Sequence, residues 1–68
     1  VESGYRLDLK NTTHSSKQIT VFQNVSGEWI VLRETHPHEA EEKRIKWTLN
    51  LSAQEEVSLR YRIRMNIE

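Results

Sequence analysis

The sequence contains no cysteine, so a disulfide, a thiolate metal site and a cysteine nucleophile are all excluded. The same absence is compatible with oxidising and reducing compartments alike. At 68 residues the chain is near the size at which a single hydrophobic core becomes marginal without disulfides, metals or a partner. We therefore expect one domain over residues 1–68, held together by side-chain packing or by a second chain.

An excess of one charge is also lacking, because 10 Lys and Arg balance 10 Asp and Glu. A nucleic-acid-binding domain normally carries a clear basic excess, so we expect no nucleic-acid partner. The sequence has no apolar run long enough to span a bilayer and no signal-peptide pattern, so we expect no direct insertion into a membrane. Because Val1 lies directly in a strand-like pattern, we expect this domain to be part of a longer protein.

Motifs of catalysis are missing as well. The serines lack the elbow motif and the oxyanion loop of serine nucleophiles, and there is no glycine-rich phosphate loop. The acid pairs at 41–42 and 55–56 would have to face each other across a cleft, which so short a chain can hardly enclose. His36 and His38 flank Pro37 without the tighter pairing that zinc motifs show. We therefore expect no enzyme activity, no cofactor and no metal site.

What the sequence does contain is an alternation of apolar and polar residues with a period of two, which is typical of β-strands with one buried face. No window holds the spacing of an amphipathic helix for long. The pattern predicts an all-β domain of five antiparallel strands, arranged as a small sandwich or a partly open barrel. The expected strands cover approximately residues 5–10, 18–23, 28–33, 45–51 and 57–67.

The connections are predicted from glycine, proline and polar residues. Gly27, in the segment NVSGE, can adopt the positive φ of a tight turn, so we expect a hairpin between the second and third strands. Pro37 keeps the polar stretch 35–43 from starting as a helix, so we expect a loop there with at most one helical turn near its end. The segment SAQE, residues 52–55, is expected to turn the chain between the last two strands.

Three asparagines begin N-x-S/T sequences, which are glycan acceptors in secreted eukaryotic proteins. They are Asn11, Asn24 and Asn50. Asparagine, serine and threonine are also ordinary turn residues at strand ends, and we favour this second interpretation.

The last two expected strands carry the clearest buried faces. Their inward residues are Ile45, Trp47, Leu49 and Leu51, and then Val57, Leu59, Tyr61, Ile63, Met65 and Ile67. Trp47 and Tyr61 share the phase of the aliphatic residues, so we predict that both rings lie in the core. The alternative is a carbohydrate-binding module in which surface aromatics stack on sugars, with Trp29 as the least settled ring.

Three segments resemble the C-terminal part of the DUF4139 family, bacterial domains of unknown function: GYRLDLKN, QITVFQNVSGEWIVL and IKWTLNLSAQEEVSLRYRIRM. Besides strand alternation, the resemblance rests on the positions of Gly4, Trp29, Pro37, Trp47 and Tyr61. It implies an immunoglobulin-like β-sandwich at the end of a longer, envelope-associated or secreted protein. The family supplies no catalytic residues to carry over. Its full domains are longer than this chain, which implies that part of the sandwich lies elsewhere in the parent protein.

The segment VSLRYRIRM places Arg60, Arg62 and Arg64 on one side of the last expected strand. With Lys46 on the strand expected beside it, this row is a candidate surface for phosphate or an acidic glycan, because successive outward residues lie about 7 Å apart and each guanidinium can take a bidentate anion. The alternative is a solvated sheet face whose charges are paired with carboxylates such as those at 55–56. The neutral net charge favours this alternative.

The segment EWIVLR departs from the one-sided pattern, because its four apolar side chains point alternately to both faces. A single sheet can cover only one of these faces, and leaving the other wet would forgo roughly 1.5–3 kcal/mol for each side chain. We therefore expect a homodimer, or cover by the remainder of the parent protein. The expected interface residues are Trp29, Ile30, Val31 and Leu32. The leading functional hypothesis is a non-catalytic module for assembly or protein–protein contact.

Overall fold

The computed structural model describes residues 1–66, which form six β-strands and no helix. The expected all-β class is confirmed, whereas the expected number of five strands is wrong. The strands are β1 (Glu2–Lys10), β2 (Lys17–Asn24), β3 (Glu28–Glu34), β4 (His38–Ala40), β5 (Arg44–Leu51) and β6 (Glu56–Asn66).

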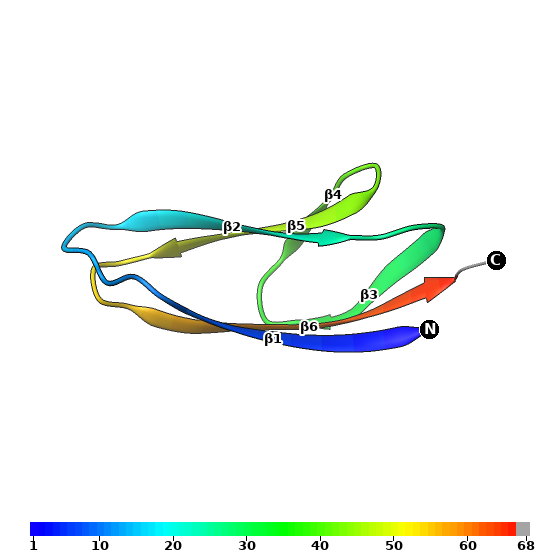
Figure 1. The fold of residues 1–68 in the computed structure, drawn as a ribbon, viewed down its shortest axis with the longest axis horizontal. Coiled ribbons are helices and arrows are strands. Elements are labelled where there is room, and N and C mark those ends of the chain that lie inside the picture. Colours follow the sequence, from blue (N-terminus) through cyan, green and yellow to red (C-terminus); the bar gives the residue numbers. More distant parts are fainter. Residues whose placement is uncertain (67–68) are drawn as a thin grey trace.

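The strands form two three-stranded antiparallel sheets, ordered β1-β6-β3 and β2-β5-β4. In Figure 1 the sheets lie as two layers, with β2, β5 and β4 above β1, β6 and β3. Over residues 1–66 they do not join into a closed barrel. Because β5 and β6 each occupy the centre of a sheet, these two strands have the most regular buried faces.

The chain changes sheet at every connection except the one between β4 and β5. Gly27 does take a positive φ of 68°, but it links β2 of one sheet to β3 of the other. The expected hairpin between these strands is therefore wrong. A Cβ atom at Gly27 would come 2.5 Å from the carbonyl oxygen of Asn66, so the close approach of β6 is a second reason for glycine here.

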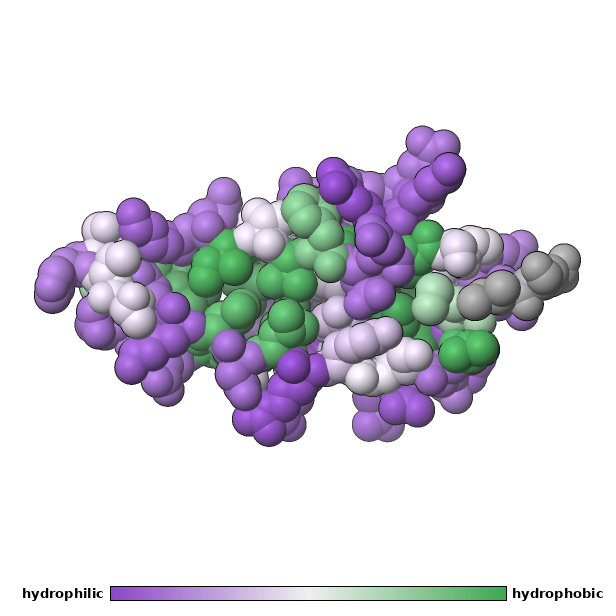
Figure 2. Space-filling model, viewed as in Figure 1, coloured by the Kyte–Doolittle hydropathy of each residue, from purple (hydrophilic) through white to green (hydrophobic). Residues whose placement is uncertain are grey.

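The hydrophobic core draws on both sheets. Figure 2 shows apolar side chains along the middle of the molecule, between margins of hydrophilic residues. Trp47 of β5 is fully buried and Tyr61 of β6 is 5% exposed, and their rings stack with centroids 4.1 Å apart. The prediction that both rings belong to the core is confirmed. Ile67, the last residue predicted to face inward, lies outside the described residues.

The polar segment 35–43 contains a short strand. β4 pairs with β5 from His38 opposite Trp47 to Ala40 opposite Ile45. The expected loop is therefore wrong for residues 38–40, and this segment contains no helical turn, of which the sequence allowed at most one. Pro37 directly precedes β4, where its missing N–H costs the ladder nothing.

β3 contains a β-bulge. Its register against β6 shifts between Val31 and Arg33, which leaves Leu32 as the extra residue. As a result Glu34 comes opposite Tyr61, a residue on the buried side of β6. The alternation predicted for EWIVLR therefore holds only as far as Val31.

One end of the two sheets is tied together by Asn11, a buried polar residue that is 4% exposed. Its Nδ2 donates to the carbonyl oxygens of Ser15, Leu51 and Ser52 at 2.8, 3.1 and 3.0 Å. Its Oδ1 accepts hydrogen bonds from the backbone N–H and the hydroxyl of Thr13 at 3.0 and 2.6 Å. Asn11 therefore joins the loop after β1 to the turn after β5, and it acts as a turn residue, as the sequence predicted.

Candidate anion-binding surface

The side of sheet β1-β6-β3 that faces away from the core carries a row of arginines. Leu59, Tyr61 and Ile63 of β6 are buried in the core. The exposed residues between and beyond them are Arg60, Arg62 and Arg64. Because side chains alternate across a strand, these arginines point to the outer face, as the sequence pattern predicted.

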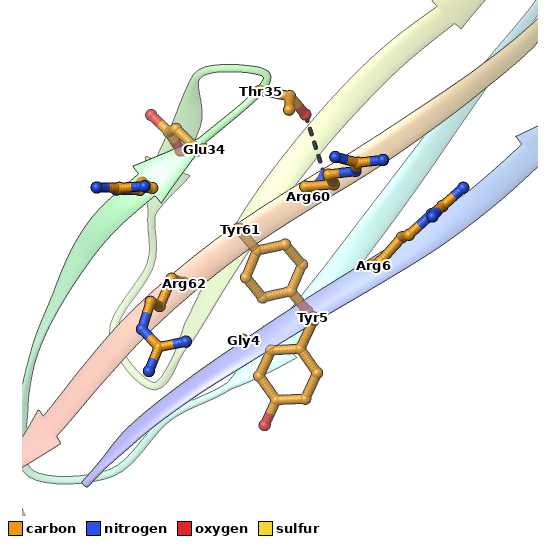
Figure 3. Close-up of a pocket in the computed structure, with 9 residues that line it drawn as sticks. Gly4, Tyr5, Arg6, Glu34, Thr35, Arg60, Tyr61 and Arg62 are labelled. Carbon is orange, nitrogen blue, oxygen red and sulfur yellow. Dashed lines mark hydrogen bonds between the residues drawn. The ribbon is translucent and has the colours of Figure 1, made fainter.

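The neighbouring strands add two further arginines to this face. Arg6 of β1 stands opposite Arg60, and Arg33 of β3 stands opposite Arg62. Opposite residues of an antiparallel pair share a face, with Cβ atoms about 5 Å apart. We call Arg6, Arg33, Arg60 and Arg62 the arginine cluster. Figure 3 shows Arg60 and Arg62 along β6, with Arg6 on the adjacent strand.

Only Arg6 of the arginine cluster forms an ion pair among residues 1–66, with Asp8 at 3.1 Å. Within the same residues, Arg33, Arg60 and Arg62 have no carboxylate oxygen within 4.0 Å. The middle of the face is therefore positively charged, although the chain as a whole is neutral.

Carboxylates frame the arginine cluster at both ends. Asp8 accepts a hydrogen bond from the Ser58 hydroxyl at 2.6 Å and one from Arg6, and these two hydrogen bonds lower the pKa of Asp8 below its usual value of 3.8. At the other end Arg64 pairs with Glu2 at 3.4 Å. The unpaired positive charge is therefore confined to the middle of the face.

A shallow hollow of about 590 Å³ lies at the arginine cluster. Gly4 lines it opposite Arg62, and a Cβ atom at Gly4 would lie 3.2 Å from a guanidinium nitrogen of that arginine. The missing side chain therefore leaves room for the guanidinium. Thr35 fixes the wall of the hollow, because its Oγ1 accepts a hydrogen bond from the backbone N–H of Arg60 at 3.1 Å (Figure 3).

This arrangement has the chemistry to hold an anion with more than one charged group. Each guanidinium presents a planar fork of N–H donors that matches a carboxylate, phosphate or sulfate. The Cβ atoms of opposite arginines lie about 5 Å apart, and successive outward positions along a strand are about 7 Å apart. Like charges directly opposite each other destabilise a sheet, so a bound anion would relieve a repulsion that the free protein carries.

Lys46 is not part of this surface. It lies in β5 of the other sheet, 3.9 Å from Glu39, so its predicted place beside the arginines is wrong. The error follows from assigning β5 and β6 to one hairpin, whereas the turn between them crosses from sheet to sheet. The carboxylates at 55–56 do not pair with the arginines either: Glu55 accepts a hydrogen bond from a backbone N–H of its own turn at 2.7 Å, and Glu56 pairs with Lys10 at 3.3 Å.

The four residues predicted to form a dimer interface have different environments. Trp29 and Val31 pack against the core of the same chain, and Leu32, in the bulge, is partly buried. Ile30 is 55% exposed. Only one of the four side chains is therefore largely open to solvent.

The aromatic residues do not share an exposed face. Trp47 and Tyr61 are buried, and Trp29 packs against the core. Tyr5, 40% exposed, stacks on Tyr61 with ring centroids 5.1 Å apart, while Phe22, 47% exposed, lies in the other sheet. A flat platform of several rings, as sugar stacking would require, is not present among residues 1–66.

Glu34 and two histidines surround the indole of Trp47. Its Nε1 donates to Glu34 Oε2 at 3.0 Å and to the carbonyl oxygen of His36 at 3.1 Å. The same carboxylate oxygen lies 2.8 Å from Nδ1 of His38. These groups give the buried indole its hydrogen-bond partners. Over the described part of the chain, no group of three or more His, Asp or Glu side chains is arranged to hold a metal ion.

Comparisons with known proteins give no relative. No model of a protein family matches the chain, and neither a curated protein nor a solved structure is significantly similar to it. Among residues 1–66, no helix is long and apolar enough to cross a membrane. The similarity to the DUF4139 family stays a prediction, and the function has to be argued from the geometry of the arginine cluster.

Proposed function

We propose that this chain is a non-catalytic binding module that contacts an acidic segment of a protein through the arginine cluster. The observation that carries this proposal is the group formed by Arg33, Arg60 and Arg62, which has no carboxylate partner among residues 1–66. The sequence favoured a solvated face whose charges are paired with carboxylates. Over residues 1–66, carboxylates pair with Arg6 and Arg64 of this face, whereas the carboxylates at 55–56 bind elsewhere and leave the other three arginines without a partner. The guanidinium donors are therefore free to bind carboxylates of another segment.

An acidic segment in extended conformation fits the arginine cluster. Alternate side chains of an extended chain repeat at about 7 Å, which is also the spacing of Arg60 and Arg62 along β6. Two carboxylates placed two residues apart can thus each meet one arginine. Arg6 and Arg33, on the flanking strands, widen the target to both sides. The hollow is open and shallow, which suits a chain lying across it better than an enclosed small molecule.

A carbohydrate-binding module is the alternative hypothesis. It depended on surface aromatics, and the burial of Trp47 and Tyr61 removes two of the three rings it used. An acidic glycan could still use the guanidiniums without any ring. The experiment below therefore includes an acidic glycan as a separate arm.

We further propose that the two sheets are an immunoglobulin-like sandwich that serves as the scaffold of this surface. The proposal is supported by the two layers, by the core drawn from both and by the central positions of β5 and β6 (Figure 1). The resemblance to the DUF4139 family implies the same architecture. Under this hypothesis the module belongs to a longer, envelope-associated or secreted protein and acts by contact rather than chemistry.

Peptide titration tests the proposed function. A labelled peptide of alternating Glu and Ser would be titrated with the 68-residue chain by fluorescence polarisation. A Gln-Ser peptide of equal length is the ligand control, and a heparin oligosaccharide is the glycan arm. We expect saturable binding of the Glu-Ser peptide alone, and weaker binding as salt is raised, because surface charges are screened.

Paired variants locate the binding. Arg60→Gln with Arg62→Gln should lower the affinity about tenfold, because two exposed charge-assisted contacts of about 0.7 kcal/mol each supply the roughly 1.4 kcal/mol that tenfold requires. Lys17→Gln with Arg44→Gln removes the same charge from the other sheet and should leave affinity unchanged. Equal losses in both pairs would mean nonspecific attraction and would contradict the proposal. Binding of heparin but not of the acidic peptide would favour the carbohydrate hypothesis.

A further inference from the structure

The edges of the two sheets differ in how well they are protected. The edge strands are β1 and β3 in one sheet and β2 and β4 in the other. An edge strand presents unpaired backbone N–H and C=O groups, which can pair with a strand of another chain. Monomeric β-proteins commonly block such pairing with charged side chains, bulges or short edge strands.

Three of the four edges carry such protection. β1 has charged residues at four of its nine positions, namely Glu2, Arg6, Asp8 and Lys10. β3 is interrupted by the bulge at Leu32, and β4 is only three residues long. The last four residues of β5 have no β4 residue beside them and form the rest of this edge, so the edge is divided between two strands. None of these edges offers a long, regular and uncharged ladder.

β2 is the unprotected edge. Its eight residues keep one register against β5, from Lys17 opposite Leu51 to Asn24 opposite Arg44, without a bulge. The strand contains no proline or glycine, and Lys17 is its only charged residue. Phe22 adds an apolar side chain that is 47% exposed. Each of these features favours pairing with a further strand.

We propose that two copies of this chain join by antiparallel pairing of β2 with β2 across a two-fold axis. Pairing must keep the buried side of both strands on one face, so either Thr20 or Val21 stands opposite its own copy. The two Lys17 side chains then lie near opposite ends, roughly 20 Å apart, and no like charges meet. The two copies of sheet β2-β5-β4 become one six-stranded sheet, twice the three strands of a single copy.

This pairing ends at two copies. Each β2 strand has one free edge, which the pairing occupies. The outer edges of the joined sheet are the three-residue β4 strands together with the last four residues of β5 beyond them. The assembly is therefore closed rather than fibrous. The arginine cluster lies on the other sheet, so the inference is independent of the proposed function. It also replaces the interface predicted at 29–32, which belongs to β3, with one at β2.

Two matched lysine variants distinguish the edges. Thr20→Lys places one positive charge on the exposed face of β2, and Ile30→Lys places the same charge at an exposed position of β3. Size-exclusion chromatography with light scattering, from micromolar to near-millimolar protein, should give twice the chain mass for the wild type at tens of micromolar. Thr20→Lys should raise the dimer dissociation constant at least about tenfold, because the two lysines would lie directly opposite each other in the Thr20 register and diagonally, about 7 Å apart, in the Val21 register. Ile30→Lys should leave that constant unchanged.

Amide hydrogen exchange of the wild type gives a second readout that needs no variant. Exchange at β2 should slow as the protein concentration rises, while exchange at β1 and β3 should not change. A wild type with single-chain mass at the highest concentration would overturn the proposal. So would a Thr20→Lys variant that dimerises like the wild type, or dissociation caused by Ile30→Lys alone, which would place the interface on β3.

Discussion

Asn11→Ala tests how the two sheets are held together at one end. The asparagine is buried, donates to three carbonyl oxygens in the loop after β1 and the turn after β5, and accepts two hydrogen bonds from Thr13. Alanine removes all of these contacts and leaves the carbonyl oxygens of Leu51 and Ser52 without their side-chain donor. The perturbation therefore acts on the junction of the sheets and leaves the hydrophobic core intact.

The expected cost of Asn11→Ala is about 3 kcal/mol. Nδ2 has only two hydrogens for its three acceptors, and the Thr13 hydroxyl can donate to Ser15 when Oδ1 is removed. The substitution therefore removes about two donated and one accepted hydrogen bond, each contributing about 1 kcal/mol net. A domain of 68 residues at about 0.1 kcal/mol per residue has a total stability of about 7 kcal/mol. The variant should therefore stay folded at room temperature, with a melting temperature lower by about 15 °C.

Thermal and urea unfolding followed by circular dichroism measure this cost. Asn50→Ala is the control, because Asn50 begins the same kind of N-x-S/T sequence but is exposed. Asn11→Asp should be at least as destabilising as Asn11→Ala, since its second oxygen would face the three carbonyl oxygens. A melting temperature of Asn11→Ala within about 3 °C of the control would refute the role assigned to this residue.

Two further substitutions address the core and the charged face. Trp47→Ala should lower stability by about 3–5 kcal/mol in urea unfolding, the usual cost of truncating a buried aromatic, and near-native stability would mean that the ring lies on the surface. Asp8→Asn tests how stability changes at acidic pH. Hydrogen bonds from Ser58 and Arg6 lower the pKa of Asp8. The contribution of this carboxylate to stability is therefore complete above about pH 4 and is lost as the pH falls through the folded-state pKa. The variant should melt lower than the wild type at neutral pH and converge with it at strongly acidic pH, whereas a constant difference across that range would exclude the carboxylate as its source.

Alternation along the chain predicted the strands at the centre of each sheet better than the rest. β5 and β6 are the central strands and have the most buried inner faces, so every second residue has to be apolar. β4 has no such requirement, because three residues at an edge contribute His38 as their one partly buried side chain. A strand of this kind produces no alternation of apolar and polar residues, so its polar segment resembles a loop in the sequence.

The connections were harder to predict, because local turn chemistry does not say which sheet the next strand joins. Gly27 takes the positive φ that a hairpin would need, yet the chain crosses between sheets there. The turn at 52–55 behaves in the same way, with Gln54 at a φ of 64°. The misplacement of Lys46 follows directly from that ambiguity.

Half of the arginine cluster follows from the sequence and half does not. Arg60 and Arg62 share a face by the period of one strand. Arg6 and Arg33 reach them only through strand pairing across long stretches of chain, and Arg33 depends in addition on the bulge in β3. Alternation along the first strand predicted that Arg6 points outward, but it did not predict which strand lies beside Arg6.

The crossing of the chain between the sheets has a consequence for how the protein folds. β1 pairs with β6, so Glu2 stands opposite Arg64 and the N-terminal nitrogen of Val1 donates to the carbonyl oxygen of Met65 at 2.9 Å. The hairpin of β4 and β5 is the one strand pair that can form between neighbours in sequence. Every other ladder has to close a long loop before its contacts compensate the lost chain entropy, which slows folding to the millisecond-to-second range typical of such topologies. Sheet β1-β6-β3 lacks its central strand until β6 has left the ribosome, so β1 and β3 wait unpaired during synthesis of everything between them and β6.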